Sequence, residues 1–441
     1  MITTIAVIGT GYLGATHAAC LAELGYAVIG VDTDPAKITK LAAGELPFHE
    51  PGLDELVAKH THSGRLEFAT EMSAIAEADL VFLCVGTPQR SDGPGADTRY
   101  LDQAVTALAP VLRRDTLIVG KSTVPVGTAP RLQGLIDAYA SEGVHLEIAW
   151  NPEFLREGRA VADTLTPDRL VFGVTSASAE QQLRTVYHQV LAAGTPCVVT
   201  DLASAELVKV SANAFLATKI SFVNAIAELC DRAGGDIVAV TEALGHDDRI
   251  GAAFLAAGLG FGGGCLPKDI RALMARAGEL GVERTLTFLR EVDDINMQRR
   301  SRVVELVREE LGGSVLGARV AVLGAAFKPH TDDVRDSPAL NVAAQLHLLG
   351  AQVQVYDPVA TANARAAFPT LTYADDLIAA VTGADLVLHA TEWPEFTELD
   401  PDHVRDLVAR PILVDARNRL NAQRWHRAGW TIRGIGRPRL T

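Results

Sequence analysis

Cysteine is scarce and scattered in this chain of 441 residues, which has only five, at positions 20, 84, 197, 230 and 265. Their number is odd and none belongs to a Cys-x-x-Cys pair. The sequence therefore argues against a disulfide framework or a zinc site and favours a reducing cytoplasm. The twelve histidines also lack a ligand spacing such as His-Glu-x-x-His, so we expect no metal.

Long apolar runs and excess positive charge are also missing. The longest apolar runs, such as Leu80–Val85, have the length of a strand and not of a membrane span, and residues 1–8 read as a strand without a basic leader. The net charge of −14 speaks against nonspecific binding of nucleic acid or membranes. Residues 416–441 alone are basic, with seven arginines and no acid, which suits a phosphate, a partner subunit or a solvated surface.

Lysine is rare, with eight residues against 32 arginines, and four of the eight lie in the motifs described below. These four are Lys121, Lys209, Lys268 and Lys328. A chain that otherwise prefers arginine keeps lysine where a compact ammonium is needed, although codon bias explains the overall ratio equally well.

The first motif is a glycine turn between two strands. The β-branched run Ile5–Ile8 leads into Gly9-Thr-Gly11-Tyr-Leu-Gly14, an amphipathic helix follows to about Gly25, and a second strand, Ala27–Val31, ends in Asp32. This order is the dinucleotide fingerprint, in which the pyrophosphate rests on the helix N-terminus and the acid accepts the ribose hydroxyls. Because Asp32 would repel a 2′-phosphate, the sequence predicts NAD rather than NADP.

Three more strands, Ala78–Val85, Leu117–Val119 and Ile148–Trp150, each end in a polar cluster. Open parallel sheets bind ligands at the carboxyl ends of their strands, so these clusters should converge on the cofactor mouth. Their polar side chains are Thr87, Thr123, Glu153 and Glu157, any of which could instead stabilise a loop or cap a helix.

A helical pattern runs from Asp201 to about Ala233, and a second from about 236 to 257. Lys209 and Asn213 interrupt the apolar first pattern and share one helix face, because they are four residues apart. They are candidates for catalysis, although a snorkelling lysine and a surface amide would give the same pattern.

The chemistry centres on Gly258-Leu-Gly-Phe-Gly-Gly-Gly-Cys265-Leu-Pro-Lys268-Asp269, which precedes helices from about 268 to 311. The glycines allow a ligand to approach the backbone closely, and Pro267 suits the first turn of a helix. Cys265 would then lie at a helix N-terminus, where a thiolate is favoured, so we interpret it as a nucleophile rather than an inert thiol.

From Arg319 the opening pattern returns without its glycine fingerprint. The segments Val320–Lys328, Val353–Pro358, Ala384–Ala390 and Pro411–Ala416 read as further strands and their loops. We therefore expect an α/β protein with two doubly wound Rossmann-like domains joined by a central helical region with a long helix. The expected bounds are residues 1–200 for the NAD domain, 201–300 for the central domain and 301–441 for a nucleotide-sugar domain.

Together these motifs resemble the UDP-glucose/GDP-mannose dehydrogenase family over nearly the whole chain. The quoted marks are GTGYLG, VGTP, KSTVPVGT, NPEFLREG, ELVKVSANAF, DDRIG, GFGGGCLPKD and AFKPHTDDVRDSP. Where the family commonly has serine before the cysteine, this chain has Gly264. The resemblance implies an NAD-dependent twofold oxidation of the primary alcohol of UDP-glucose to UDP-glucuronate. UDP-N-acetyl-hexosamine and GDP-mannose remain alternative substrates, and a 3-hydroxyacid dehydrogenase of the 6-phosphogluconate type is a remote alternative.

The resemblance also assigns residues. It implies catalytic roles for Cys265 as thiohemiacetal and thioester former, Lys209 and Asn213 as oxyanion donors, and Asp269 with Thr123 as the hydrolytic base and its water holder, with Glu153 as the rival base. Cofactor contacts are implied for Gly9, Gly11, Tyr12, Leu13, Gly14, Asp32, Lys37, Thr87, Thr123, Glu157, Lys268 and Arg335. Substrate contacts are implied for Glu153, Phe154, Leu155, Arg156, Glu157, Lys209, Asn213, Arg249, Phe254, Leu255, Ala256, Ala257, Gly258, Gly262, Lys328 and Arg417. Arg249 resembles an arginine that reaches the substrate across a dimer interface, so we expect a homodimer or a larger homo-oligomer.

Overall fold

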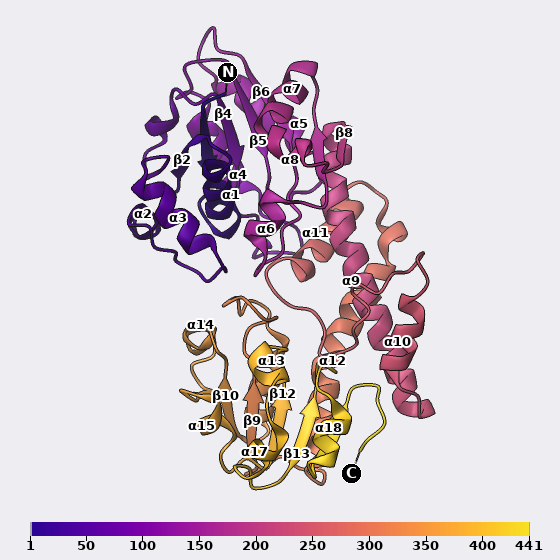
Figure 1. Cartoon of the computed structure of the whole chain (residues 1–441). Coiled ribbons are helices and arrows are strands. Elements are labelled where there is room, and N and C mark those ends of the chain that lie inside the picture. Colours follow the sequence, from indigo (N-terminus) through magenta and orange to yellow (C-terminus); the bar gives the residue numbers. More distant parts are fainter. Residues whose placement is uncertain (1, 441) are drawn as a thin grey trace. The chain divides into compact units, whose positions relative to one another are not determined.

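The computed structural model describes residues 2–440, which fall into two compact units (Figure 1). Unit 1 contains residues 1–212 and 271–281, and unit 2 contains residues 213–270 and 282–441. Residues 1 and 441, which the predicted first and last domains include, lie outside the described residues. The three predicted domain bounds stay a prediction.

Unit 1 is built on an eight-stranded sheet in the order β3-β2-β1-β4-β5-β6-β7-β8. The first six strands are parallel in the order typical of a dinucleotide-binding fold, and β7 pairs with β6 in the antiparallel sense. The strands are β1 (Thr4–Ile8), β2 (Ala27–Val31), β3 (Leu66–Ala69), β4 (Leu80–Leu83), β5 (Thr116–Gly120), β6 (Leu146–Trp150), β7 (Leu170–Gly173) and β8 (Cys197–Thr200). The helices are α1 (Tyr12–Glu23), α2 (Pro35–Ala42), α3 (Leu53–His62), α4 (Arg99–Leu108), α5 (Thr128–Tyr139), α6 (Ala160–Leu165), α7 (Ala177–Val186) and α8 (His188–Ala192), with a 3₁₀ turn at Met72–Ile75.

Unit 2 repeats this topology, which confirms the second doubly wound domain. Its six strands are all parallel in the order β11-β10-β9-β12-β13-β14. They are β9 (Arg319–Leu323), β10 (Gln352–Tyr356), β11 (Thr372–Tyr373), β12 (Leu386–His389), β13 (Ile412–Asp415) and β14 (Thr431–Gly434). The helices are α10 (Ile237–Gly245), α12 (Phe288–Glu310), α13 (Pro338–Leu348), α14 (Thr361–Ala367), α15 (Leu377–Val381), α16 (Pro394–Thr397), α17 (Pro401–Arg405) and α18 (Ala422–Arg427), with a 3₁₀ turn at Glu283–Leu286.

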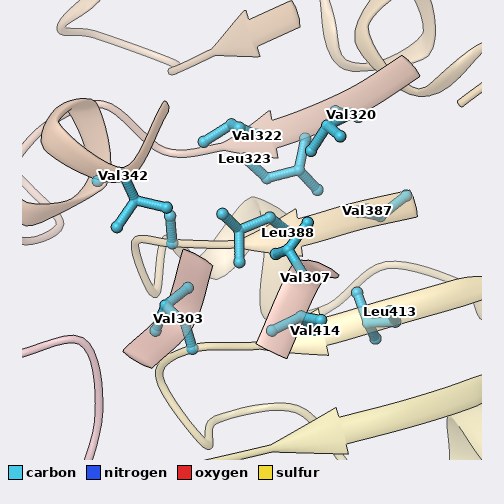
Figure 2. Packing of buried hydrophobic residues seen from close by; sticks show 14 of the residues in the cluster. Val303, Val307, Val320, Val322, Leu323, Val342, Val387, Leu388, Leu413 and Val414 are labelled. Atoms are coloured by element: carbon cyan, nitrogen blue, oxygen red, sulfur yellow. The ribbon is translucent and has the colours of Figure 1, made fainter. Parts of the chain in front are cut away.

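The core of unit 2 explains why its strands read as continuous apolar runs. Parallel strands are covered on both faces, so β9, β12 and β13 are apolar at nearly every position. Figure 2 shows Val303 and Val307 of α12 packed with residues of these strands, among them Leu388 and Val414, and all four side chains are fully buried.

Two helices contain the boundaries between the units. The long helix α9 (Leu202–Ala233) confirms the first helical pattern, and α11 (Leu266–Glu279) begins directly after Cys265. By length and composition α9 is apolar enough to cross a membrane, and 44% of its most apolar window is buried in the protein. The core helix of a soluble protein can have the same length and composition, so these properties of α9 are no evidence for a membrane span.

The second helical prediction, about 236–257, was too long. The helix α10 ends at Gly245, and the residues after it form turns with Gly251 at φ +68° and Phe254 at φ +64°. A left-handed backbone cannot continue a right-handed helix, and an apolar, alanine-rich stretch does not reveal that conformation in the sequence.

Candidate active site

The glycine turn after β1 forms a cradle for a dinucleotide in unit 1. Gly9 has φ +86°, and a Cβ added at Gly14 would lie 1.8 Å from the Gly9 carbonyl oxygen. Only glycine therefore permits α1 to start this close to the turn. Gly11 is the residue before α1, so the N–H groups of the first turn, which begins with Tyr12 and Leu13, are available to a pyrophosphate.

Asp32 follows β2 beside this turn, as the fingerprint requires. Its Oδ2 accepts hydrogen bonds from the Thr10 N–H at 2.8 Å and from Lys37 Nζ at 2.8 Å, and its Oδ1 accepts one from the Asp34 N–H at 3.1 Å. Partial burial opposes ionisation, but these donors outweigh it and lower the pKa of Asp32 below its usual value. An ionised acceptor at this place fits the ribose hydroxyls of NAD. Lys37 is linked to this site by its hydrogen bond to Asp32.

The polar clusters after β4 and β5 meet as expected. The Thr87 hydroxyl donates to the Thr123 carbonyl oxygen at 2.7 Å, which joins the two loops at the carboxyl edge of the sheet. The loop after β6 supplies a buried ion pair, in which Glu153 Oε1 lies 2.9 Å from Lys209 Nζ on α9. Glu153 Oε2 accepts the Leu155 N–H at 2.7 Å, so both carboxylate oxygens have a donor.

Two other residues of this loop have partners within the loop region. Arg156 binds Asp163 with two hydrogen bonds of 2.8 and 2.6 Å, and the guanidinium of Arg169 lies 3.7 Å from the ring centroid of Phe154. The predicted substrate contacts of Arg156 and Phe154 therefore compete with interactions already in place.

In unit 2 the glycine loop packs tightly against the segment 327–336. A Cβ would lie 2.3 Å from the Asp336 carbonyl oxygen at Gly262, 2.9 Å from the Phe327 ring at Gly263 and 2.4 Å from the Arg335 guanidinium at Gly264. The Gly263 N–H also donates to the Arg335 carbonyl oxygen at 2.9 Å. The close approach of a second loop thus requires glycine at position 262, where backbone is met, whereas at Gly264 only the movable end of Arg335 would have to shift.

Cys265 is exposed at the end of this loop. Its carbonyl oxygen accepts the Asp269 N–H at 3.0 Å, the first backbone bond of α11, which makes Cys265 the capping residue before the helix. This confirms the predicted helix start. The N–H groups of the first turn point toward this end of the helix and favour a negative charge on the sulfur.

One turn further, Asp269 is buried between two predicted site residues. Its Oδ2 accepts a hydrogen bond of 2.6 Å from Asn213 Nδ2, and its Oδ1 lies 2.5 Å from Lys268 Nζ. Asp269 is 2% exposed, so the ammonium of Lys268 and the amide of Asn213 replace water as partners of the carboxylate. The structure thus joins Asn213 to Asp269, and Lys209 to Glu153.

The remaining predicted site residues of unit 2 include the substrate contacts Arg417 and Lys328 and the cofactor contact Arg335. Arg417 donates to the carbonyl oxygens of Ala390, Phe327 and Gly260 at 2.7, 3.0 and 3.1 Å, so it holds the start of the glycine loop. Lys328 Nζ lies 5.4 Å from the Phe327 ring centroid, and Arg335 pairs with Asp333 at 2.7 Å.

The segment Phe254–Gly258 lies beside the C-terminal strands. The Gly258 N–H donates to Asn224 Oδ1 at 2.9 Å, and Asn418 Nδ2 donates to the Ala257 carbonyl oxygen at 3.2 Å. Leu255 is buried, whereas Phe254 and Ala256 are exposed. Arg249 is far more exposed, at 89% of its side chain, and pairs only with the nearby Asp247 at 2.6 Å among the described residues.

Arginines of the basic C-terminal segment form ion pairs within unit 2. Arg433, Arg437 and Arg439 pair with Asp231, Asp236 and Glu310, at 3.4, 3.4 and 2.8 Å. These ion pairs favour a structural role for the arginines over phosphate binding.

Comparison with known proteins agrees with this geometry. Residues 3–191, 203–298 and 321–422 match the NAD binding domain, the central domain and the UDP binding domain of the UDP-glucose/GDP-mannose dehydrogenase family. The chain is 40% identical to the UDP-glucose 6-dehydrogenase YwqF of Bacillus subtilis (strain 168), over 98% of this chain and 97% of that protein. The chain belongs to the UDP-glucose/GDP-mannose dehydrogenase family.

Solved structures place this dehydrogenase in the same fold. A UDP-glucose dehydrogenase from Pyrobaculum islandicum is similar with a TM-score of 0.89 and 40% identity, over 96% of each chain. A UDP-D-ManNAc dehydrogenase from Pyrococcus horikoshii has a TM-score of 0.85 and 28% identity, over 99% of each chain. The family match confirms the resemblance and makes this chain an NAD-dependent dehydrogenase.

Glu50 is a residue of this dehydrogenase that the sequence did not reveal. It is 2% exposed, accepts the Gly158 and Ala160 N–H groups at 2.6 and 2.7 Å, and accepts the Tyr12 hydroxyl. It thereby connects the dinucleotide turn to the loop that contains Glu157. The only sequence signal is an acid before Pro-Gly, which is typical of many surface turns.

Proposed function

We propose that this dehydrogenase oxidises the primary alcohol of UDP-glucose twice, to UDP-glucuronate, with two molecules of NAD. The observation that favours this sugar is the identity of 40% to proteins named UDP-glucose dehydrogenases over nearly the whole chain, against 28% to a UDP-D-ManNAc dehydrogenase. UDP-N-acetyl-hexosamine and GDP-mannose are the alternative substrates.

Cys265 is the nucleophile of this proposal. NAD, when bound, accepts the two hydrides. Between the two oxidations the Cys265 sulfur adds to the aldehyde carbon. The aldehyde oxygen takes up a proton, and the product is a thiohemiacetal. The second oxidation removes the carbon-bound hydride and the hydroxyl proton and leaves a thioester. Water then cleaves the C–S bond, which releases the sugar acid and regenerates the thiol. The exposure of Cys265 and its place before α11 support this role.

Lys209 and Asn213 are the proposed donors to the oxyanion. They are four residues apart on α9 and are 6% and 8% exposed, and donors in a site with little water stabilise a developing charge strongly. Each has a carboxylate partner, Glu153 for Lys209 and Asp269 for Asn213. Either carboxylate can take a proton from the hydrolytic water, with Thr123 as the proposed holder of that water for Asp269.

We further propose that two copies of this chain associate through α9. Phe215, Phe222 and Leu229 are seven residues apart, and 66%, 54% and 63% of their surfaces are exposed in the single chain. An apolar stripe at heptad spacing on a long helix suits a second helix of the same kind. Arg249, with its exposed side chain, would then reach the site of the neighbouring copy. The exposed Cys265 suits the reducing cytoplasm.

The stoichiometry of NADH tests the reaction. Purified protein is supplied with limiting UDP-glucose, and NADH is followed by absorbance to completion. We expect two NADH per UDP-glucose; one would instead favour a hydroxyacid-type dehydrogenase, and none would refute the proposal. A thermal-shift panel of UDP-glucose, UDP-N-acetyl-hexosamines and GDP-mannose, each with NAD, identifies the preferred sugar.

A further inference from the structure

Lys121 is a buried lysine to which the reaction above assigns no role. It follows β5 directly, and its Nζ donates to Asn151 Oδ1 at 3.0 Å and lies 3.4 Å from the Asn151 carbonyl oxygen. The same Nζ lies 5.7 Å from the ring centroids of Phe82 and Tyr187. Lys121 is 6% exposed, so these partners take the place of water around its charge.

Asn151 links Lys121 to the loop that contains Glu153. Its Nδ2 donates to the Val171 carbonyl oxygen at 2.9 Å, and its Oδ1 also accepts the Tyr187 hydroxyl at 2.7 Å. Asn151 is separated from Glu153 only by Pro152, whose ring fixes φ. The direction in which Glu153 leaves the sheet therefore depends on how Asn151 is held.

The charge of Lys121 also acts on Glu153, because both residues line one cavity of unit 1. Burial lowers the pKa of Lys121 to about 8, while Cys84 and Glu153 oppose this shift and the charge of Lys209 adds to it. The Lys121 ammonium and the Glu153 carboxylate have opposite charges and therefore attract each other across this cavity. The other ionisable groups that line this cavity are His17, Asp163, Asp168, Arg169 and Tyr187.

We propose that Lys121 is a positioning residue for this dehydrogenase: with Asn151 it fixes the loop that presents Glu153, and its ammonium attracts that carboxylate from the same cavity. Lysine places a compact ammonium within hydrogen-bond distance of Asn151 Oδ1, a task that suits a point charge and agrees with the retention of lysine here in an arginine-rich chain. The inference rests on the proposed function, because Lys121 acts through Glu153 as a base in thioester hydrolysis.

Lys121→Met tests the charge, and Tyr187→Phe is the matched control. Both substitutions remove one donor from Asn151 Oδ1, but only the first removes a charge. We measure kcat and KM for UDP-glucose from pH 5.5 to 9, thermal unfolding, and the acyl adduct on the Cys265 peptide by mass spectrometry after acid quench. Lys121→Gln, which keeps a donor but no charge, is the second variant in case the methionine variant does not fold.

For Lys121→Met we expect kcat about threefold to tenfold lower with nearly unchanged KM. The Cys265 adduct should accumulate, because hydrolysis lags behind acylation. Tyr187→Phe should lower the unfolding temperature with a smaller loss of kcat, and the additional loss from Lys121→Met should vanish in a Glu153→Gln background.

Equal kcat values for wild type, Lys121→Met and Tyr187→Phe would overturn the inference, and so would a loss of kcat from Lys121→Met that persists in Glu153→Gln. Neither result touches the proposed function as long as wild-type protein forms two NADH per UDP-glucose. Wild-type protein that forms no NADH would refute the proposed function itself, and the inference with it.

Discussion

At the scale of single residues, the two carboxylates proposed as bases each have a specific nitrogen partner. Asp269 binds Asn213 across 56 positions of sequence, and Glu153 binds Lys209 just as remotely. The sequence identified Lys209 and Asn213 as polar interruptions of an apolar helix. It identified Glu153 in a polar cluster after a strand and Asp269 in the glycine-rich motif. It could not pair them, because a tertiary contact depends on the packing of distant elements, whereas a motif records only neighbours along the chain.

The first residue-scale prediction concerns Asp32. Asp32→Ala should narrow the preference for NAD over NADP by about tenfold or more, because it removes one buried acceptor for the ribose and one charge that repels a 2′-phosphate. The measurement is kcat/KM for both cofactors. Asp34→Ala is the control, because the Asp34 side chain caps α2 and does not face the glycine turn. Comparable wild-type values for the two cofactors would contradict this account.

A second residue-scale prediction concerns Gly264. A Cβ here would lie 2.4 to 2.7 Å from the guanidinium atoms of Arg335, which is exposed and can move away. Gly264→Ser should therefore leave the unfolding temperature within about 2 °C and raise the KM for NAD severalfold, since Arg335 is displaced from its predicted cofactor contact. An unchanged KM would remove Arg335 from the cofactor site.

At the scale of elements, the strands were the most predictable part of the fold. The range predicted for β2 is the one observed. The other predicted strands agree within two residues at each end, except that Val320–Lys328 also includes the loop after β9, since apolar runs bounded by glycine and polar residues are a strong local signal. The short strands β3, β7, β11 and β14 were not predicted. The turn after α10 was missed as well: one of its left-handed residues is Gly251, a cue that the helical interpretation did not use, and the other is Phe254, for which sequence gives no cue.

The element-scale prediction concerns the contact between α5 and α9. Glu206 of α9 accepts the Gly127 and Ala129 N–H groups at 2.7 and 2.6 Å, so it caps the N-terminus of α5. Burial nevertheless raises the pKa of Glu206 to about 7, although these backbone donors lower it. Its folded pKa thus exceeds its unfolded value, and between about pH 4.5 and 7 the folded state binds more protons than the unfolded state.

This sign means that the Glu206 contribution to stability falls as pH rises through that window. Replacing the group with a neutral amide removes the effect. Between pH 5 and pH 7.5 the wild type should therefore lose about 1 to 3 kcal/mol of unfolding free energy relative to Glu206→Gln. Chemical unfolding at both pH values measures it, and a pH-independent difference would show that the group stays ionised.

At the scale of the whole molecule, the repeat of one topology in both units agrees with two nucleotide ligands, one for each sheet. The first six strands of the first sheet have the same order as the six strands of the second, yet the glycine fingerprint Gly9-x-Gly11-x-x-Gly14 follows the first strand of the first sheet alone. The matches of residues 3–191 to an NAD binding domain and 321–422 to a UDP binding domain follow that division.

The stripe on α9 gives a prediction about assembly. Phe222→Asp places a charge in the middle of the stripe and should convert the proposed dimer to monomers in sedimentation, with loss of activity if Arg249 serves the neighbouring copy. Leu348→Asp, at a side chain that is 83% exposed on another helix, is the matched control and should leave the sedimentation unchanged. Fully active wild-type monomers at assay concentration would refute the dimer, and recovery of the protein with membranes would assign the stripe to lipid instead.

The central claim is that Cys265 holds the substrate between the two oxidations, and Cys265→Ala tests it most directly. The variant should bind NAD and UDP-glucose with nearly unchanged affinity, since the thiol acts in chemistry and little in binding, yet form no UDP-glucuronate. Wild-type protein quenched in acid should show an adduct on the Cys265 peptide, enriched when Asp269 or Glu153 is replaced. If Cys265→Ala instead produced the acid at a near wild-type rate with two NADH per turnover, a hydrated aldehyde would be the second hydride donor and the claim would be wrong.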